Sequence, residues 1–124
     1  MALKTKSIRS PEEDMDGTRI CIMRSYNPDK HPDYASVDEH LQDLSPSSSL
    51  LSDYRKGMGW DQYVRRFTAE VLVQHSDMVK DLAERARGED LTLLCYEREP
   101  AYCHRRLVAL ACRMYEPDLE LHIR

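Results

Sequence analysis

Two short apolar segments open the chain, separated by an acidic stretch. The segments LKTKSI and TRICIMRS are rich in apolar and β-branched residues, which is typical of strands. Between them, RSPEEDMDG is acidic and contains Pro11 and Gly17, two residue types that interrupt regular structure. The pattern therefore predicts two strands joined by a loop.

From Val37 onward, apolar positions recur at helical spacing. Three helices are predicted, over residues 45–57, 59–75 and 76–88. The first has Ser45 as N-cap, Pro46 at its first helical position and Gly57 just past its end. The second carries one apolar stripe, which consists of Trp60, Tyr63, Val64, Phe67 and Val71. The predicted inner face of the third consists of Met78, Val79, Leu82, Ala83 and Ala86.

The run LTLLC is almost continuously apolar, which is typical of a strand covered on both faces in a parallel sheet. A final helix is predicted to end near Tyr115, and the alternation in DLELHI predicts a closing strand. The order strand-strand-helix-helix-helix-strand-helix-strand favours an α/β fold. We expect one small domain over residues 1–124, a three-layer sandwich with a mainly parallel sheet.

Composition limits the partners and the location. The 124 residues suffice for one domain with a core of its own. Lys and Arg number 18 against 22 Asp and Glu, so nonspecific binding of duplex DNA, which depends on neutralising phosphates, is not expected. No segment approaches the roughly 18 consecutive apolar residues of a membrane span, and MALKTKSIRS lacks the apolar region of a signal peptide. We therefore expect a cytoplasmic protein without membrane contact, with four thiols: Cys21, Cys95, Cys103 and Cys112.

The segment LTLLCYEREPAYCHRR carries the candidate chemistry at a strand-to-helix junction. Ligands of open α/β sheets bind outside the carboxyl ends of strands, and helix N-termini attract anions. Pro100 suits the first helical position, which places His104, Arg105 and Arg106 in the first turns. Cations at a helix N-terminus are unfavourable for stability. Either a bound anion or loop carboxylates such as Glu97 must therefore neutralise them, and the sequence leaves both interpretations open.

A helical wheel predicts the directions of the side chains in the last helix. Its apolar face consists of Leu107, Leu110, Ala111 and Met114. Cys103 falls near the middle of that face and is expected to point at the sheet. His104 lies at its edge, where one ring nitrogen can be anchored and the other presented. Arg106 flanks the opposite edge, and Arg105 is expected to point away from the core.

Cys95 ends its strand and has two interpretations. It could be a nucleophile activated by His104 and the helix dipole, or a packed core thiol. The Cys-x5-Arg spacing of phosphate-cradling thiol phosphatases is missing, because the corresponding position holds Ala101. A zinc set of Cys95, Cys103, His104 and Glu97 lacks the usual spacing, and a Cys95–Cys103 redox pair lacks the Cys-x-x-Cys spacing. We therefore predict neither a metal nor a cofactor.

Arg24 stands at the end of TRICIMRS. If that strand runs parallel to LTLLC, the carboxyl ends of both strands open into one crevice. Arg24 could then meet Glu97, or share an anion with His104 and Arg105. The alternative is an ordinary surface arginine.

The segment LTLLCYEREPAYCHRRLVA resembles the signature of the domain-of-unknown-function 488 family, an apolar strand ending in Leu-Cys, then Glu, then a Cys-His-Arg triplet that opens a helix. TKSI, DGTRICIMRS, LSPSSSLL and GWDQYVRRFTAEV also stand in the family's usual order, so the resemblance extends over most of the chain. It implies a compact α/β domain with the motif at the carboxyl edge of the sheet, and no particular activity. The candidate site residues that it implies are Arg24, Glu97, Cys103, His104 and Arg105. Relatives tend to carry an acidic residue two positions before the strand-end arginine, where this chain has Ile22.

Together these observations predict a polar, anion-compatible pocket. Its expected ligand is a phosphate-containing small molecule, such as a nucleotide or sugar phosphate, or a nucleic-acid end. His104 is the best general acid or base, because imidazole titrates near neutrality. Glu97 would orient it, and Arg24, Arg105 and Arg106 would hold negative charge. The expected reaction is hydrolysis or transfer at a phosphate ester; the alternative is a noncatalytic binding or regulatory module in which the Cys-His-Arg cluster is a structural network.

Overall fold

Five parallel strands form one sheet. The computed structural model describes residues 1–31, 34 and 36–124. The strands lie in the order β3-β2-β4-β1-β5, and they are β1 (Ala2–Ser7), β2 (Thr18–Cys21), β3 (Glu39–His40), β4 (Leu91–Cys95) and β5 (Glu120–Ile123). β4 is the central strand, and all of its residues are buried, as the apolar run LTLLC predicted.

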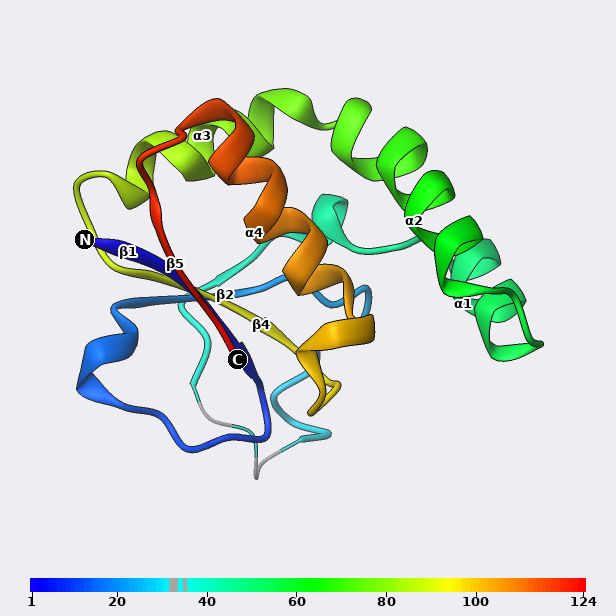
Figure 1. Cartoon of the computed structure of the whole chain (residues 1–124). Helices are drawn as coiled ribbons and strands as arrows, with labels where there is room; N and C mark the ends of the chain where they lie inside the picture. Colours follow the sequence, from blue (N-terminus) through cyan, green and yellow to red (C-terminus); the bar gives the residue numbers. More distant parts are fainter. Residues whose placement is uncertain (32–33, 35) are drawn as a thin grey trace.

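Helices cover one face of the sheet and loops cover the other (Figure 1). The helices are α1 (Ser48–Arg55), α2 (Trp60–Phe67), α3 (Ser76–Ala86) and α4 (His104–Tyr115). α2 continues into the π-helical segment η3 (Thr68–Val73), and short 3-10 turns form η1 (Asp14–Asp16), η2 (Gln42–Leu44) and η4 (Pro100–Tyr102). Within the described part of the chain, no helix has both the length and the apolar content needed to cross a membrane. The predicted α/β fold with a parallel sheet is confirmed, and the helices lie on one face of that sheet.

The first predicted helix begins later than expected. Its N-cap is Ser47, whose hydroxyl oxygen accepts a hydrogen bond of 3.0 Å from the backbone N–H of Leu50. The predicted N-cap, Ser45, instead donates its hydroxyl to the carbonyl oxygen of Gln42, at 2.5 Å. The stretch before it, which the pattern predicted as helical, contains the edge strand β3 and the turn η2. A strand of two residues is too short to leave a periodicity that the sequence could reveal.

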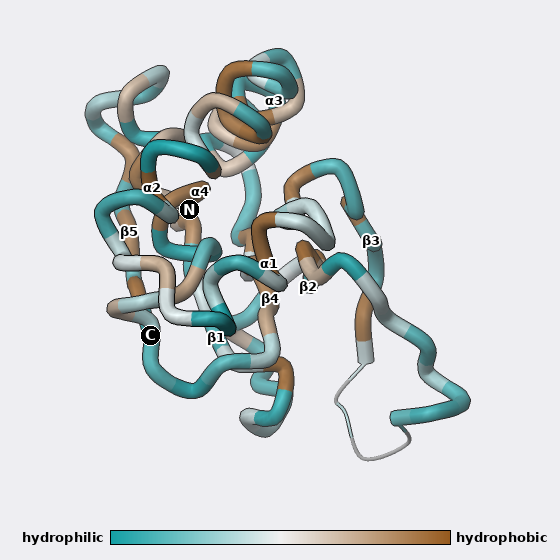
Figure 2. Tube along the Cα trace, turned by 90° about the vertical axis from the view of Figure 1, so that its right-hand side faces the viewer, coloured by the Kyte–Doolittle hydropathy of each residue, from teal (hydrophilic) through white to brown (hydrophobic). Residues whose placement is uncertain are grey.

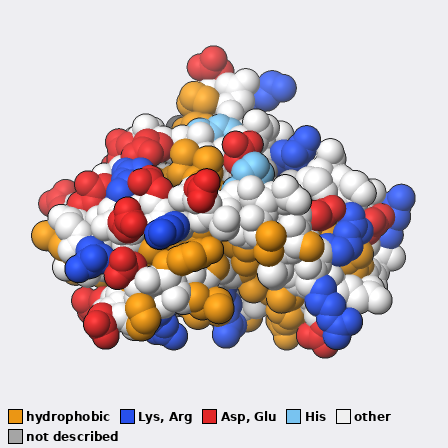
Figure 3. Space-filling model, turned by 90° about the horizontal axis from the view of Figure 1, so that it is seen from above, with side chains coloured by type: hydrophobic (Ala, Val, Ile, Leu, Met, Phe, Trp, Pro, Cys, Tyr) orange, Lys and Arg blue, Asp and Glu red, His pale blue; other side chains and the backbone are white. Residues whose placement is uncertain are grey.

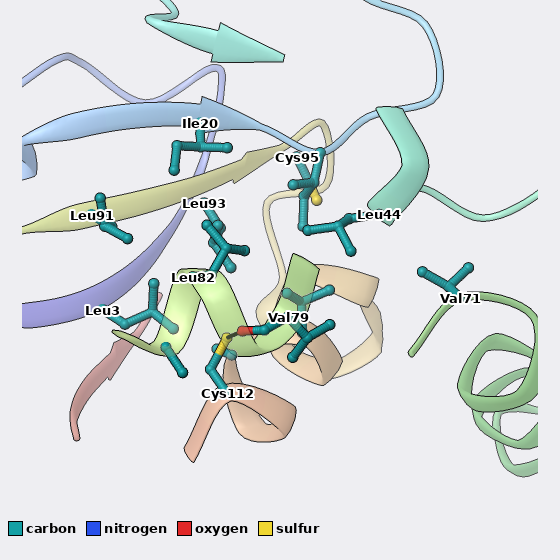
Figure 4. Packing of buried hydrophobic residues seen from close by; sticks show 14 of the residues in the cluster. Leu3, Ile20, Leu44, Val71, Val79, Leu82, Leu91, Leu93, Cys95 and Cys112 are labelled. Atoms are coloured by element: carbon teal, nitrogen blue, oxygen red, sulfur yellow. Dashed lines mark hydrogen bonds between the residues drawn. The ribbon is translucent and has the colours of Figure 1, made fainter. Parts of the chain in front are cut away.

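The helix face of the sheet carries the larger hydrophobic core (Figure 4). Strand side chains meet those of α3 and α4 there, and the set includes Leu3, Ile20, Leu91, Leu93, Val79, Leu82, Ala83, Val108 and Ala109. Tyr63, Phe67 and Val71 of the predicted stripe are buried as well, whereas Trp60 and Val64 are half-buried. Figure 2 shows the same division along the chain, with hydrophobic stretches in strands and helices and hydrophilic stretches in the connecting loops.

The loop face of the sheet buries a cluster of charged side chains. The ammonium group of Lys6 donates to both carboxylate oxygens of Asp16, at 3.0 and 3.1 Å, and the guanidinium of Arg19 also binds Asp16. All three residues are at most 4% exposed. Burial alone would raise the pKa of Asp16, but the backbone N–H of Glu13 and the charges of Lys6 and Arg19 outweigh it and lower that pKa. The cluster therefore fastens the acidic loop 8–17 to β1 and β2.

We expect Asp16→Asn to lower the free energy of unfolding by about 3–5 kcal/mol, because two buried cations lose their carboxylate. The control is Asp53→Asn, whose ion pair with Arg66 joins side chains that are 45% and 33% exposed and should contribute less than about 1 kcal/mol. Urea denaturation at neutral pH measures both losses. Because the folded-state pKa of Asp16 is lowered, its contribution is present above the ordinary value of 3.8 and is lost as the pH falls further. Equal losses in the two variants would contradict this account.

Candidate functional site

A cavity of about 720 Å³ opens at the carboxyl ends of β2 and β4. Because these strands are parallel neighbours, the segments that follow them leave the sheet at the same edge. The segment after β2 contributes Met23, Arg24 and Ser25, and the α1 region contributes Pro46, Ser48, Leu51, Tyr54 and Arg55. The remaining lining residues are Tyr63 of α2 and, from the β4–α4 segment, Cys95, Tyr96, Glu97, Glu99, Tyr102, Cys103 and His104.

Most of the residues singled out by the sequence meet at this cavity. The lining includes Arg24, Cys95, Glu97, Cys103 and His104. Arg106 is exposed on α4 and is not part of the lining, and Arg105 is buried behind it. The structure therefore places Arg24 and the thiols on one cavity but separates the two consecutive arginines from it.

Two thiols and one imidazole form a cluster on the cavity lining. Cys95 is the last residue of β4, Cys103 is the extended residue directly before α4, and His104 is the first residue of α4. Their two Sγ atoms and a ring nitrogen lie within 4.8 Å of one another. The Sγ atom of Cys95 is 3.3 Å from Nε2 and 3.7 Å from Nδ1 of His104. This is the spacing at which a thiol and an imidazole exchange a proton.

The ring of His104 is anchored by the main chain. Its Nε2 lies 2.6 Å from the carbonyl oxygen of Ile22, just after β2. Because a carbonyl oxygen only accepts hydrogen bonds, Nε2 carries a hydrogen, and Nδ1 is left to accept or release a proton. Phe67 packs beside the ring, with 5.6 Å between the ring centroids. One nitrogen is thus anchored, as predicted; the anchor described here is a carbonyl group, while Glu97 lies exposed at the cavity.

The surroundings shift the pKa values of the two thiols in opposite directions. A hydrogen bond from the Cys95 thiol, the ring of His104 and the charge of Arg105 together lower the pKa of Cys103, against the effect of its burial. Burial raises the pKa of Cys95, and the neighbouring Cys103 raises it further. The N-terminus of α4 adds partial positive charge beside Cys103. Of the two thiols, Cys103 is therefore the one whose surroundings favour the thiolate form.

Arg105 is fully buried, which corrects the helical-wheel prediction that it points away from the core. Its guanidinium donates to the carbonyl oxygens of Glu97 at 2.7 Å, Arg98 at 3.2 Å and Arg124 at 3.1 Å. Because these acceptors satisfy the charged group, a core position suits it. The buried face of α4 consists of Arg105, Val108, Ala109 and Cys112.

The predicted apolar stripe of α4 lies towards the outside. Leu107, Leu110 and Ala111 are only partly buried, and Met114 is 84% exposed. Figure 3 shows hydrophobic side chains gathered among charged ones on the face seen from above, over α3 and α4. The helical-wheel prediction was wrong because it considers only apolar residues. The inward position of Arg105 depends on hydrogen bonds to backbone carbonyl oxygens, which a wheel does not include.

Aromatic residues that the sequence did not mark as site residues line the cavity. Tyr54 and Tyr63 lie against each other, with 4.8 Å between ring centroids. Tyr102 is largely exposed and stands edge-on to Trp60, at 5.5 Å. Tyr63 follows the helical stripe of α2, which predicted it as core only. Tyr102 carries no pattern of its own, because single tyrosines are common on surfaces. Arg55 belongs to a group of basic residues around Trp60 for which a solvated helix face is the default interpretation.

Metal binding was considered for the same cluster. In the described chain, Cys95, Cys103 and His104 are the one group of three or more metal-ligating side chains that converge. Structural zinc sites use four such ligands. No fourth Cys, His, Asp or Glu of the described residues joins the group, and Nε2 of His104 is already engaged by Ile22. Three ligands are too few for a structural zinc site, but two thiolates and one imidazole with an open fourth position match a catalytic one. Without a metal, the cluster supports the chemistry of a thiolate beside an imidazole.

Comparison with known sequences identifies the protein family of the chain. Residues 3–114 match the family model DUF488-N3a, which is described as the active DUF488-N3 subclade. The chain belongs to the DUF488 family. It is 26% identical over 110 residues to the uncharacterized protein YeaO of Escherichia coli (strain K12), and the match covers 88% of this chain and 95% of YeaO. No solved structure shows a significant match to the chain.

In this DUF488 protein, Ile22 contributes to the site through its backbone carbonyl group. The side chain of Ile22 is fully buried in the core. Its carbonyl oxygen holds the ring of His104.

Cys103 is expected to react with iodoacetamide at neutral pH, because a lowered pKa keeps the thiolate present below the ordinary thiol value of 9.0. Cys112 is the internal control, since burial raises its pKa to about 12. Peptide mass spectrometry after brief alkylation across a pH series gives, for each cysteine, the pH at which alkylation reaches half of its maximum. A Cys103 half-point at or above the ordinary value would contradict the assigned thiolate.

The substitution Arg105→Ala should lower the free energy of unfolding by about 3 kcal/mol, because a fully buried side chain is truncated and three backbone carbonyl groups lose their charged donor. The neighbouring Arg106→Ala is the matched control, and as an exposed substitution it should change stability by no more than about 0.5 kcal/mol. Chemical denaturation followed by circular dichroism measures both. Similar effects of the two variants would show that the guanidinium of Arg105 does not hold the β4–α4 loop.

Proposed function

We propose that this DUF488 protein is a thiol-dependent hydrolase or transferase that acts at a phosphate ester of a nucleotide-like ligand or a nucleic-acid end. One observation carries the proposal. Cys95, Cys103 and His104 converge within 4.8 Å on a cavity that also presents Arg24 and Arg55. A reducing compartment such as the cytoplasm, which keeps thiols reduced, belongs to the same proposal.

Cys103 is the proposed nucleophile. Its thiolate attacks the phosphorus atom, and the ester oxygen leaves with a proton from His104. Water then attacks the cysteinyl phosphate, His104 takes up the proton of that water, and phosphate leaves as the thiolate is restored. An alcohol in place of water gives transfer. Nδ1 is the proton-carrying atom, because Nε2 is held by Ile22. Glu97, exposed on the cavity lining, is the second acid–base candidate.

Recognition of the ligand uses charge and aromatic rings. Arg24 and Arg55 are the proposed partners of the phosphate, since a guanidinium matches its geometry. Tyr54 and Tyr102 offer ring surfaces to a base, and such stacking contributes about 1–3 kcal/mol per base. The volume of about 720 Å³ lies within the roughly 300–1,000 Å³ typical of small-ligand pockets.

The two other arginines take different parts in this proposal. Arg105 adds its positive charge from behind the β4–α4 loop, because its hydrogens are directed to backbone carbonyls. Its charge favours an anion near Cys103 without direct contact. Arg106, which is exposed and not part of the cavity lining, has no role in the proposal and serves as a control.

The alternative is a noncatalytic binding or regulatory module. It is favoured by the hydrogen bonds of Arg105 and His104, which join separate backbone segments whether or not a reaction takes place. The two functions differ in one respect. A binding module holds its ligand without releasing a product, and Cys103→Ser changes nothing but ligand affinity.

Nucleoside monophosphates or short phosphorylated oligonucleotides are expected to raise the Tm of the chain. Arg24→Ala should raise the Kd of the bound ligand roughly 10- to 150-fold, the equivalent of one charge-assisted hydrogen bond. Arg106→Ala is the control and should leave the Kd unchanged. A thermal-shift screen finds the ligand, and isothermal titration calorimetry measures the Kd.

Turnover is measured with the same ligands through phosphate release or product formation. Cys103→Ser should abolish it while ligand binding persists. If every ligand leaves the Tm unmoved, or if Arg24→Ala and Arg106→Ala weaken binding equally, the proposed site is wrong.

A further inference from the structure

The four cysteines fall into two pairs with different surroundings. Cys95 and Cys103 line the cavity, and their Sγ atoms lie within 4.8 Å of each other. Cys21 is buried in the smaller hydrophobic cluster on the loop face of the sheet. Cys112 is buried between α3 and α4, where its thiol donates to the carbonyl oxygen of Val79 at 3.5 Å (Figure 4). Cys95 and Cys103 are thus close together on the cavity lining, where they are 1% and 3% exposed, while Cys21 and Cys112 are fully buried away from that lining.

The backbone around the cavity pair allows the two sulfur atoms to meet. A disulfide joins sulfur atoms about 2.05 Å apart, so closing a gap of at most 4.8 Å needs a movement of less than about 3 Å. Cys95 is held in the sheet, where its carbonyl oxygen accepts from Ile8 at 2.7 Å. The segment between the cysteines, residues 96–102, is largely exposed, and Arg105 holds it at the carbonyl oxygens of Glu97 and Arg98, so the movement that closes the gap is that of the two side chains.

We propose that Cys103 is a site of oxidation by peroxides and that Cys95 is its resolving thiol, so that the two form a reversible disulfide across the cavity floor. This inference rests on the proposed function in one respect only, since it takes Cys103 as the reactive thiol of that site. It adds a modification that blocks the nucleophile.

The first step consumes one peroxide. The Cys103 sulfur attacks one oxygen of hydrogen peroxide, the O–O bond breaks, and the other oxygen leaves as hydroxide. Cys103 becomes a sulfenic acid, oxidised by two electrons, and the peroxide is reduced.

The second step needs no further oxidant. The Cys95 sulfur attacks the sulfur of the sulfenic acid, the S–O bond breaks, and hydroxide leaves with the Cys95 proton as water. His104 is placed to carry that proton, because its ring nitrogens lie 3.3 and 3.7 Å from the Cys95 sulfur.

The disulfide has two consequences for the site. It removes the thiolate and the thiol donor beside it, so the cavity loses its nucleophile until a reductant restores it. It also protects Cys103 from the irreversible sulfinic and sulfonic acids, because the sulfenic acid is consumed at once by its neighbour. Without Cys95, oxidation of Cys103 would proceed to those acids.

The test uses the full reduced chain treated with several equivalents of hydrogen peroxide, enough for two successive oxidations of one thiol, then alkylated in denaturant and mapped by peptide mass spectrometry. The expected result is the loss of two of the four thiols and a linked peptide pair containing Cys95 and Cys103, both reversed by dithiothreitol. Cys95→Ser should instead show Cys103 as sulfinic acid that dithiothreitol does not reverse. Cys112→Ala is the matched control and should still form the Cys95–Cys103 link. Circular dichroism verifies that each variant is folded.

Several outcomes would overturn the inference. They are four titratable thiols after peroxide treatment, a link between two chains in place of the internal one, and stoichiometric zinc that protects both thiols. If the disulfide fails to form while Cys103 still alkylates rapidly at neutral pH, only this inference falls and the proposed function stands. If the disulfide forms but no ligand binds and no product appears, the proposed function falls and the disulfide stands.

Discussion

The buried guanidinium of Arg105 is the interaction on which the site depends. Carbonyl oxygens from two consecutive residues of the β4–α4 loop, Glu97 and Arg98, and from the last residue, Arg124, accept its hydrogens. Such groups cost about 1–3 kcal/mol each when they are buried without a donor. The same loop determines where α4 begins. A single set of hydrogen bonds therefore fixes the start of the helix and, with it, the position of Cys103 and His104 relative to Cys95.

The difference between the two cavity thiols follows from the elements that carry them. Cys95 is the last residue of a central strand, with protein on both faces, and burial disfavours its thiolate. Cys103 precedes a helix, whose free N–H groups and partial positive charge favour a thiolate, and Arg105 and His104 add to this effect. The same residue type thus has a raised pKa at a strand end and a lowered pKa at a helix start. The pairing gives the site both a thiolate and a hydrogen-bond donor for it, without a metal.

Periodicity predicted the parts of the fold in which side chains alone decide the outcome. The central strand Leu91–Cys95 and the inner face of α3 are as expected. A strand buried on both sides requires a continuous apolar run, and a helix that packs on a sheet requires an apolar stripe at helical spacing, so both can be recognised in the sequence. The edge strand β3 was missed because it has only two residues. The cluster of Lys6, Asp16 and Arg19 was missed because alternating charges in a strand normally indicate a solvated face, and here an acidic loop covers them. The inward turn of Arg105 was missed because its partners are backbone carbonyl groups, which leave no trace in the pattern of side chains.

The Cys-His-Arg triplet shows why consecutive residues at a helix start do not form one cluster of charges. Successive side chains of a helix diverge by about 100°, so neighbours cannot all face one ligand. Here Cys103 and His104 reach the cavity, His104 also reaches across to the carbonyl oxygen of Ile22, and Arg105 turns into the protein. The cations that do line the cavity, Arg24 and Arg55, come from the segment after β2 and from α1. A site at this edge of the sheet is therefore assembled from three distant segments, and the triplet supplies its reactive groups and the structural support behind them but not its exposed positive charge.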